Sequence, residues 1–134
     1  ALALHPRYAY LYARDVLKAP WPEAESVVAQ DPKWAYIYAR DRLEAPFPEA
    51  EPIIARDPRY AFYYARDVLD GPFPEAEMYL SHNAEYAYWY ARHVLRGPWP
   101  EAEPVIARDD RFRSLYASLV LKTPEDKARF RNCI

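Results

Sequence analysis

The sequence predicts an all-α fold, an α-solenoid of about five repeats, each 26 residues long with a helix, a turn and a short helix. One observation behind this prediction is an aromatic residue that starts each unit at a constant spacing, at Tyr8, Trp34, Tyr60, Tyr86 and Phe112. Another is composition: the 134 residues include 14 Pro at regular intervals but only 2 Gly, which is typical of short elements with defined ends. The content of 13 Tyr and 4 Trp argues against disorder.

These repeats form one predicted tandem-repeat domain over residues 1–134. Residues 1–7 align with the end of a preceding repeat, full repeats start at 8, 34, 60 and 86, and residues 112–134 are expected to form a degenerate C-terminal capping repeat. The first residues carry no polar cap, which fits either a processed fragment or an end that stacks on another molecule. Both interpretations stay open.

Each repeat is expected to contain a first helix of about 12 residues, such as 32–43, roughly 18 Å long. Its N-cap column, one position in every repeat, consists of His5, Asp31, Asp57, Asn83 and Asp109. Prolines are expected to end this helix at positions 20, 46, 72 and 98, before a stiff proline-aromatic-proline corner. The second element, such as 49–55, is predicted to be partly 3₁₀, with its glutamates at the positive end of the helix.

The pattern D-P-x-Y-A-Y-x-Y-A-R-D-V-L followed by P-F-P-E-A-E resembles short helical repeats of bacterial and phage proteins of unassigned function. More distantly it is similar to the leucine-rich-repeat variant, whose units pair an α-helix with a 3₁₀ helix. The resemblance covers nearly the whole chain. It implies a right-handed α-solenoid and no particular activity.

On a helical wheel, one arc of the first helix faces away from the neighbouring helices and from the second layer. We define an apolar and an arginine column on this arc, and a ring column beside it that should meet the neighbouring long helices, and call the three together the binding ridge. The apolar column is Leu11, Ile37, Tyr63, Trp89 and Leu115; the arginine column is Arg14, Arg40, Arg66 and Arg92; and the ring column is Tyr10, Tyr36, Phe62 and Tyr88. Because an apolar column on a wet face usually marks a contact surface, we expect binding there. Each arginine can lie on the ring four residues before it.

A structural interpretation of the same columns is also open. If the superhelix closes over this face, the apolar column is core. The arginines can equally form a structural ladder by pairing with Asp15, Asp41 and Asp67, or with the glutamates of the second element, and exposed pairs of this kind contribute little stability.

The residues that would support catalysis or cofactor binding are not arranged for it. His5, His82 and His93 occupy different columns, Cys133 is the only cysteine, and the two glycines are isolated. We therefore expect no enzyme, no cofactor and no metal site. No apolar run approaches the roughly 18 residues of a membrane span, so we expect no membrane partner, and no visible signal predicts a compartment.

Two functions fit these features. The first is a structural scaffold that assembles with itself, as a homo-oligomer, filament or ring, or binds a protein partner through the ridge. The alternative is single-stranded RNA, bound by tyrosine and arginine columns at one unit per base, possibly inside a homo-oligomeric ribonucleoprotein assembly. The net charge of −2 is uneven, because residues 108–134 carry seven basic and four acidic residues, a net of +3.

Overall fold

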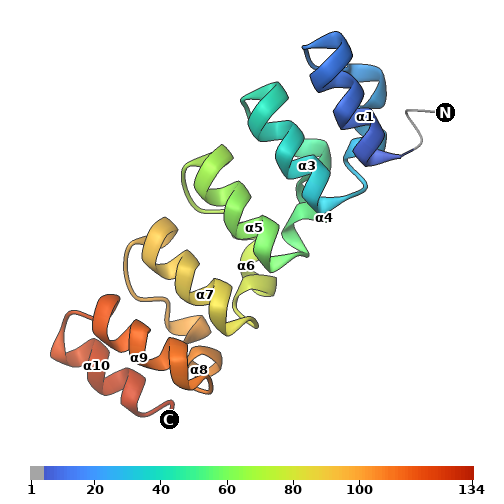
Figure 1. Cartoon of the computed structure of the whole chain (residues 1–134). Coiled ribbons are helices and arrows are strands. Elements are labelled where there is room, and N and C mark those ends of the chain that lie inside the picture. The colour runs from blue at the N-terminus through green and yellow to red at the C-terminus, as the bar shows by residue number, and fades with distance from the viewer. Residues whose placement is uncertain (1–4) are drawn as a thin grey trace. The chain divides into compact units, whose positions relative to one another are not determined.

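The structure is a computed structural model, and it describes residues 5–134. Helices in tandem and no strand occur in this part of the chain, which confirms the predicted all-α repeat fold (Figure 1). The chain divides into two compact units, Ala1–Ala76 (unit 1) and Glu77–Ile134 (unit 2). Residues 1–4, which align with the end of a preceding repeat, lie outside the described residues. The handedness of the solenoid stays a prediction.

The long helices of unit 1 lie side by side, with α1 against α3 and α3 against α5 (Figure 1). In unit 2, α7 packs against α9. The α-helices are α1 Pro6–Tyr12, α2 Glu25–Val28, α3 Pro32–Tyr38, α4 Glu51–Ala55, α5 Pro58–Tyr64, α6 Pro74–Leu80, α7 Ala84–Tyr90, α8 Glu103–Ile106, α9 Asp110–Leu119 and α10 Pro124–Arg131. None of the helices within residues 5–134 is both long and apolar enough to cross a membrane.

The predicted N-cap column caps all five long helices. The carboxylate of Asp31 accepts a hydrogen bond from the backbone N–H of Trp34 at 3.1 Å, and Asn83 accepts one from Tyr86 at 3.0 Å. The side chains of His5, Asp57 and Asp109 do the same at α1, α5 and α9. Each cap satisfies backbone N–H donors that have no partner within the first helical turn. The cap column therefore fixes where every long helix starts.

Four of the long helices continue past the α-helix as a π-helical turn, which the sequence did not predict. These turns are Ala13–Leu17, Ala39–Leu43, Ala65–Leu69 and Ala91–Leu95. Each ends at a residue with positive φ, namely Lys18, Glu44, Asp70 and Arg96. The next backbone N–H returns to the first carbonyl of the turn, as from Gly71 to Ala65 at 3.1 Å. The left-handed residue therefore ends the helix, two residues before the proline, and the expected span of 32–43 agrees with the observed helical residues 32–43.

The second element begins as predicted with a 3₁₀ turn in three repeats. These turns are Pro22–Ala24, Pro48–Ala50 and Pro100–Ala102, and each leads into a short α-helix. The segment that starts at Pro74 is α-helical throughout, as α6. The corner aromatics Phe47, Phe73 and Trp99 are buried, so these corners are part of the core.

The core consists of alanines and aromatic rings. Ala35, Ala39 and Ala50 are fully buried, which lets the first and second elements approach closely. A helical wheel places Val16 on the same face as these alanines, but the structure leaves it 59% exposed. The π turn is wider than an α turn, so a wheel drawn at a constant angle misplaces the residues that follow its start.

The last repeat differs from the preceding four. Helix α9 is a single α-helix without a π turn, and α10 packs its Phe130 ring 4.9 Å from the ring of Tyr116. Arg129 lies in the register that holds glutamate in the preceding repeats, and it pairs with Glu103 at 2.7 Å. The charge reversal gives the buried Glu103 carboxylate a cationic partner that no other glutamate of this register has among the described residues.

Candidate interaction surface

A buried tyrosine, which we call the clamp tyrosine, ties each repeat to the one before it. The hydroxyl group of Tyr64 donates to Oε2 of Glu51 at 2.6 Å and accepts from the backbone N–H of Phe47 at 2.8 Å. The same donation to the last glutamate of the Glu-Ala-Glu segment occurs from Tyr38 to Glu25, from Tyr90 to Glu77 and from Tyr116 to Glu103. The tyrosine and the glutamate recur in every one of these repeats at a constant spacing because they form the same hydrogen bond between neighbouring repeats.

The clamp tyrosines hold their protons tightly. Burial, followed by the hydrogen bond to Glu51, raises the pKa of Tyr64 well above its ordinary value. Burial and the bonds to Glu25 and Glu103 raise the pKa of Tyr38 and Tyr116 in the same way. An ionised tyrosine would lie next to a carboxylate at hydrogen-bond distance in a buried site. The folded state therefore requires the neutral form of each of these tyrosines.

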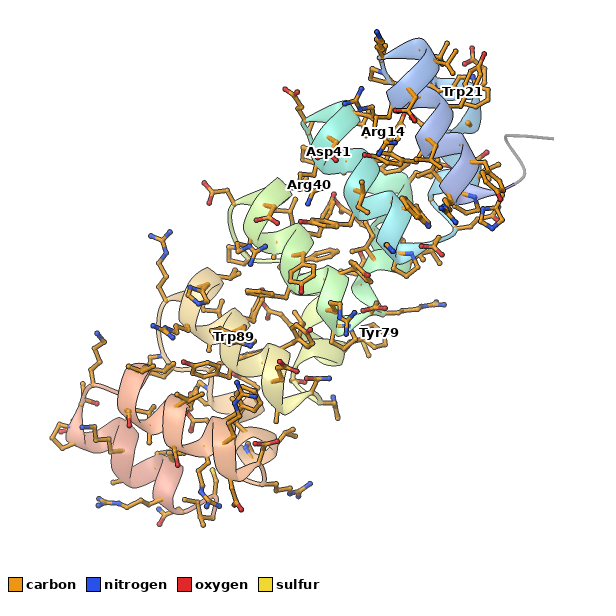
Figure 2. The ribbon with its side chains drawn as sticks, viewed as in Figure 1. Arg14, Trp21, Arg40, Asp41, Tyr79 and Trp89 are labelled. Carbon is orange, nitrogen blue, oxygen red and sulfur yellow. The ribbon has the colours of Figure 1, made fainter. Side chains whose placement is uncertain are left out.

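In unit 1, the arginine column forms an ion-pair ladder with the aspartate that follows each arginine. Arg66 donates from Nε and from a terminal nitrogen to the two carboxylate oxygens of Asp67, at 2.7 and 2.9 Å. Arg40 engages Asp41 with the same two-bond geometry at 2.7 and 3.1 Å. The pair Arg14 and Asp15 repeats it in the first repeat. Figure 2 shows the labelled arginines and Asp41 towards the C-terminal ends of the long helices of unit 1.

A tyrosine of the preceding repeat joins this ladder. The hydroxyl group of Tyr10 donates to Asp41 at 3.0 Å, and that of Tyr36 donates to Asp67. The hydrogen bond from Arg40, and then the one from Tyr10, lowers the pKa of the Asp41 carboxyl group. Each aspartate is thus held ionised, and the ladder carries no net charge.

The arginines also lie over rings, as the sequence predicts. The guanidinium carbon of Arg14 is 5.7 Å from the centre of the Tyr10 ring, and that of Arg40 is 5.2 Å from Tyr36. Arg66 lies 5.2 Å from Phe62 and 5.1 Å from Tyr63. The guanidinium groups are therefore fixed on two sides, by a carboxylate and by a ring.

The ring column corrects one part of the predicted ridge. All four of its members, Tyr10, Tyr36, Phe62 and Tyr88, are buried. The rings of Tyr10, Tyr36 and Tyr88 pack against the next long helix of their own unit, as Tyr10 does at 5.4 Å from Trp34. The helical wheel places them beside the free arc, where they should meet neighbouring long helices, and their burial agrees with that placement rather than with a role in binding. They stabilise the stack and offer no open face to a ligand.

The apolar column is partly exposed in both units. Leu11, Ile37 and Tyr63 in unit 1, and Trp89 and Leu115 in unit 2, are all half-buried. The Trp89 ring stacks on the His93 ring at 5.5 Å with an interplanar angle of 15°, on α7 and the turn that follows it (Figure 2). The side chains of the apolar column are thus partly buried by neighbouring residues and partly accessible to solvent.

Unit 2 breaks the ladder at its arginine. Position 93 holds histidine where the earlier repeats hold aspartate, and among the described residues Arg92 has no carboxylate partner. A terminal nitrogen of Arg92 donates to the hydroxyl group of the buried Tyr88 at 3.0 Å. Arg92 therefore donates to the ring-column tyrosine as Arg40 does, but it lacks the neighbouring aspartate that neutralises the other arginines of its column.

A hollow of about 410 Å³ lies beside this arginine. Its lining combines three cationic side chains with small and apolar groups: Arg92, Arg96, Gly97, Leu119, Val120 and Lys122. The lining includes no acidic residue. The sequence predicted neither this hollow nor the clamp; the one signal for the hollow was the change from aspartate to histidine within an otherwise constant column.

Metal-binding chemistry has no visible support in residues 5–134. In that range no group of three His, Cys, Asp or Glu side chains converges as a metal site would require. Cys133 donates a weak hydrogen bond from Sγ to the backbone carbonyl of Arg129 at 3.8 Å.

Comparison with protein-family models, with curated proteins and with solved structures finds no match for this chain. The class of the protein therefore follows from its own geometry: a tandem helical-repeat protein with a partly exposed apolar column.

Proposed function

We propose that this chain is a non-enzymatic helical-repeat scaffold that assembles with further copies of itself through the apolar column. The observation that carries the proposal is the setting of Tyr63. Its ring lies 5.7 Å from Tyr36 and 5.9 Å from Tyr60, with the Arg66 guanidinium 5.1 Å from its centre, yet it stays half-exposed. A partly exposed aromatic ring that is already immobilised loses little conformational entropy on binding, which is typical of interface anchors.

The charge pattern beside the column favours a second copy as the partner. In unit 1 every arginine of the ladder is next to the aspartate that neutralises it, so positive and negative groups alternate along the face. An interface between identical patches must be complementary to itself, and alternating charges meet this requirement where a single-sign face does not.

Single-stranded RNA, the other expectation from the sequence, is less well supported in unit 1. The rings of Tyr10, Tyr36 and Phe62 are buried, so bases could not stack on them. The arginines of the ladder already donate to carboxylates, which would repel phosphate groups.

Sedimentation velocity over a range of protein concentrations tests the scaffold. We expect wild-type chains to form particles larger than a monomer, and both Tyr63→Asp and Trp89→Asp to reduce particle size because each places a charge in the apolar column. Met78→Asp is the matched control, since Met78 is 65% exposed and lies outside the column. A wild type that stays monomeric, or a Tyr63→Asp variant of unchanged particle size, would contradict the proposal.

A further inference from the structure

We infer that unit 2 carries a binding site for a phosphate monoester or inorganic phosphate, formed by Arg92, Arg96 and Lys122. This inference does not depend on the scaffold function. The three side chains line one hollow of about 410 Å³, which is open to solvent, and no acidic side chain lines it. A phosphate dianion needs several cationic donors on one side and space for its oxygens, and this lining provides both.

Arg92 is the residue that distinguishes this place from the other repeats. In unit 1 the corresponding guanidinium donates from Nε and a terminal nitrogen to the next aspartate, as Arg66 does to Asp67. In unit 2 the following residue is His93, and no carboxylate among the described residues takes the same edge of Arg92. That edge is the one an arginine uses for two-bond recognition of a phosphate group.

Arg92 is also held in place before any ligand arrives. Its terminal nitrogen donates to the hydroxyl group of Tyr88 at 3.0 Å, and Tyr88 is fully buried. An arginine fixed by a buried group loses less rotamer entropy on binding than one that is free in solvent.

The other two cations have an ordinary explanation that does not account for Arg92. Arg96 follows the last turn of the helix that contains α7, and Lys122 follows the end of α9, where positive charges offset the helix dipole. Arg92 lies within the turn Ala91–Leu95, and its position is occupied by a neutralised arginine in unit 1. The charge that remains unneutralised is thus specific to this repeat.

The test is a titration of the full chain with inorganic phosphate at low salt, followed by the arginine Nε–Hε signals in two-dimensional NMR. We expect saturable shifts at Arg92 and Arg96, and about tenfold weaker binding in Arg92→Gln, since a hydrogen bond to a charged group is lost. Arg66→Gln is the matched control and should bind within about twofold of wild type, because its guanidinium is already engaged. Lys122→Gln is the second variant in case Arg92→Gln fails to fold.

Three ligands separate the sources of the phosphate group. Saturation by inorganic phosphate alone assigns the site to the free ion, and tighter binding of a nucleoside 5′-monophosphate assigns it to an organic monoester; both support the inference. Tighter binding of an oligouridylate without terminal phosphates at the same residues would overturn it in favour of an RNA strand. Absence of saturable shifts at Arg92, or equal loss in Arg66→Gln and Arg92→Gln, would overturn it outright.

Discussion

The arginines of unit 1 and the arginine of the fourth repeat occupy the same column but differ in their electrostatic setting. Arg40 and Arg66 each donate two hydrogen bonds to the next aspartate, whereas Arg92 is followed by histidine and lines a hollow with two other cations. The backbone is the same in each case, an α-helix that continues as a π turn. One residue beside the arginine therefore decides whether the guanidinium is part of the structure or open to a ligand.

The clamp shows the opposite behaviour, because it is maintained in both units. Tyr64 donates to Glu51 in unit 1, and Tyr116 donates to Glu103 in unit 2. What varies is the reinforcement at the end of the array, where Arg129 adds an ion pair to Glu103. The repeat thus combines a constant hydrogen bond between the clamp tyrosine and glutamate with surface charges that differ between unit 1 and unit 2.

Alkaline pH should have the largest effect on stability, because it ionises the clamp tyrosines that are present in both units. Below about pH 10 the clamp contributes its full stability, since tyrosine is neutral in both the folded and unfolded chain. The pKa of Tyr38, Tyr64 and Tyr116 is raised in the folded state, so the unfolded chain ionises first as the pH rises and stability falls from about pH 10 upward. Helical circular dichroism and tyrosinate absorbance should change together. Full tyrosine ionisation with the helices intact would contradict this.

Removing the buried glutamate of unit 2 should destabilise more than removing its equivalent in unit 1. Glu103→Ala leaves Tyr116 without its acceptor and Arg129 with Asp126 as its remaining carboxylate, and it should cost about 3 kcal/mol, the lower end for a broken buried pair because Arg129 is 39% exposed. Glu51→Ala leaves only Tyr64 and a half-buried site, so the expected cost is about 1–2 kcal/mol. Urea unfolding measures both. Equal costs would mean that Arg129 adds nothing to the cap.

Deleting one clamp hydroxyl group isolates the hydrogen bonds from the packing. Tyr64→Phe keeps the ring but leaves the Glu51 carboxylate and the N–H of Phe47 without that partner, at an expected cost of about 1–2 kcal/mol. Tyr8→Phe is the control, because the Tyr8 side chain is 49% exposed and should change stability by less than about 0.5 kcal/mol. Thermal unfolding of the two variants side by side measures the difference, and equal effects would argue against the clamp.

Breaking the ladder should have the smallest effect on stability. Arg66→Gln loses an exposed ion pair and should cost less than about 1 kcal/mol. Arg92→Gln has no carboxylate to lose and should cost less still. Urea midpoints of the two variants measure these values. A larger cost for Arg92→Gln would mean that this arginine is structural in unit 2 as well.

The repeat boundaries were predictable because their signals are local in sequence. A capping side chain such as Asp31 reaches backbone donors only two or three residues ahead, so spacing alone located every long helix. The 3₁₀ start of the second element followed from its prolines in the same way, since proline is tolerated only in a first turn.

The π turn and the clamp were not predictable, for two different reasons. No proline or glycine within Ala65–Leu69 signals the wider turn, which ends at the left-handed Asp70. The clamp joins residues 13 apart in sequence, and Glu51 in the first turn of a helix already has an adequate local explanation as a favourable charge. The ring column was placed correctly beside the neighbouring helices, but how completely those helices bury it is a property of the stack, so its inclusion in the binding ridge is not supported.

The most direct test of the comparison restores the missing aspartate. His93→Asp should place a carboxylate beside Arg92, move its Nε–Hε signal to the region of Arg14, Arg40 and Arg66, and abolish saturable phosphate binding. His93→Asn, which has the same size but no charge, should leave both the signal and the binding close to wild type. A His93→Asp variant that binds phosphate as wild type does, with an unmoved Arg92 signal, would contradict the claim that the neighbouring residue sets the role of the arginine.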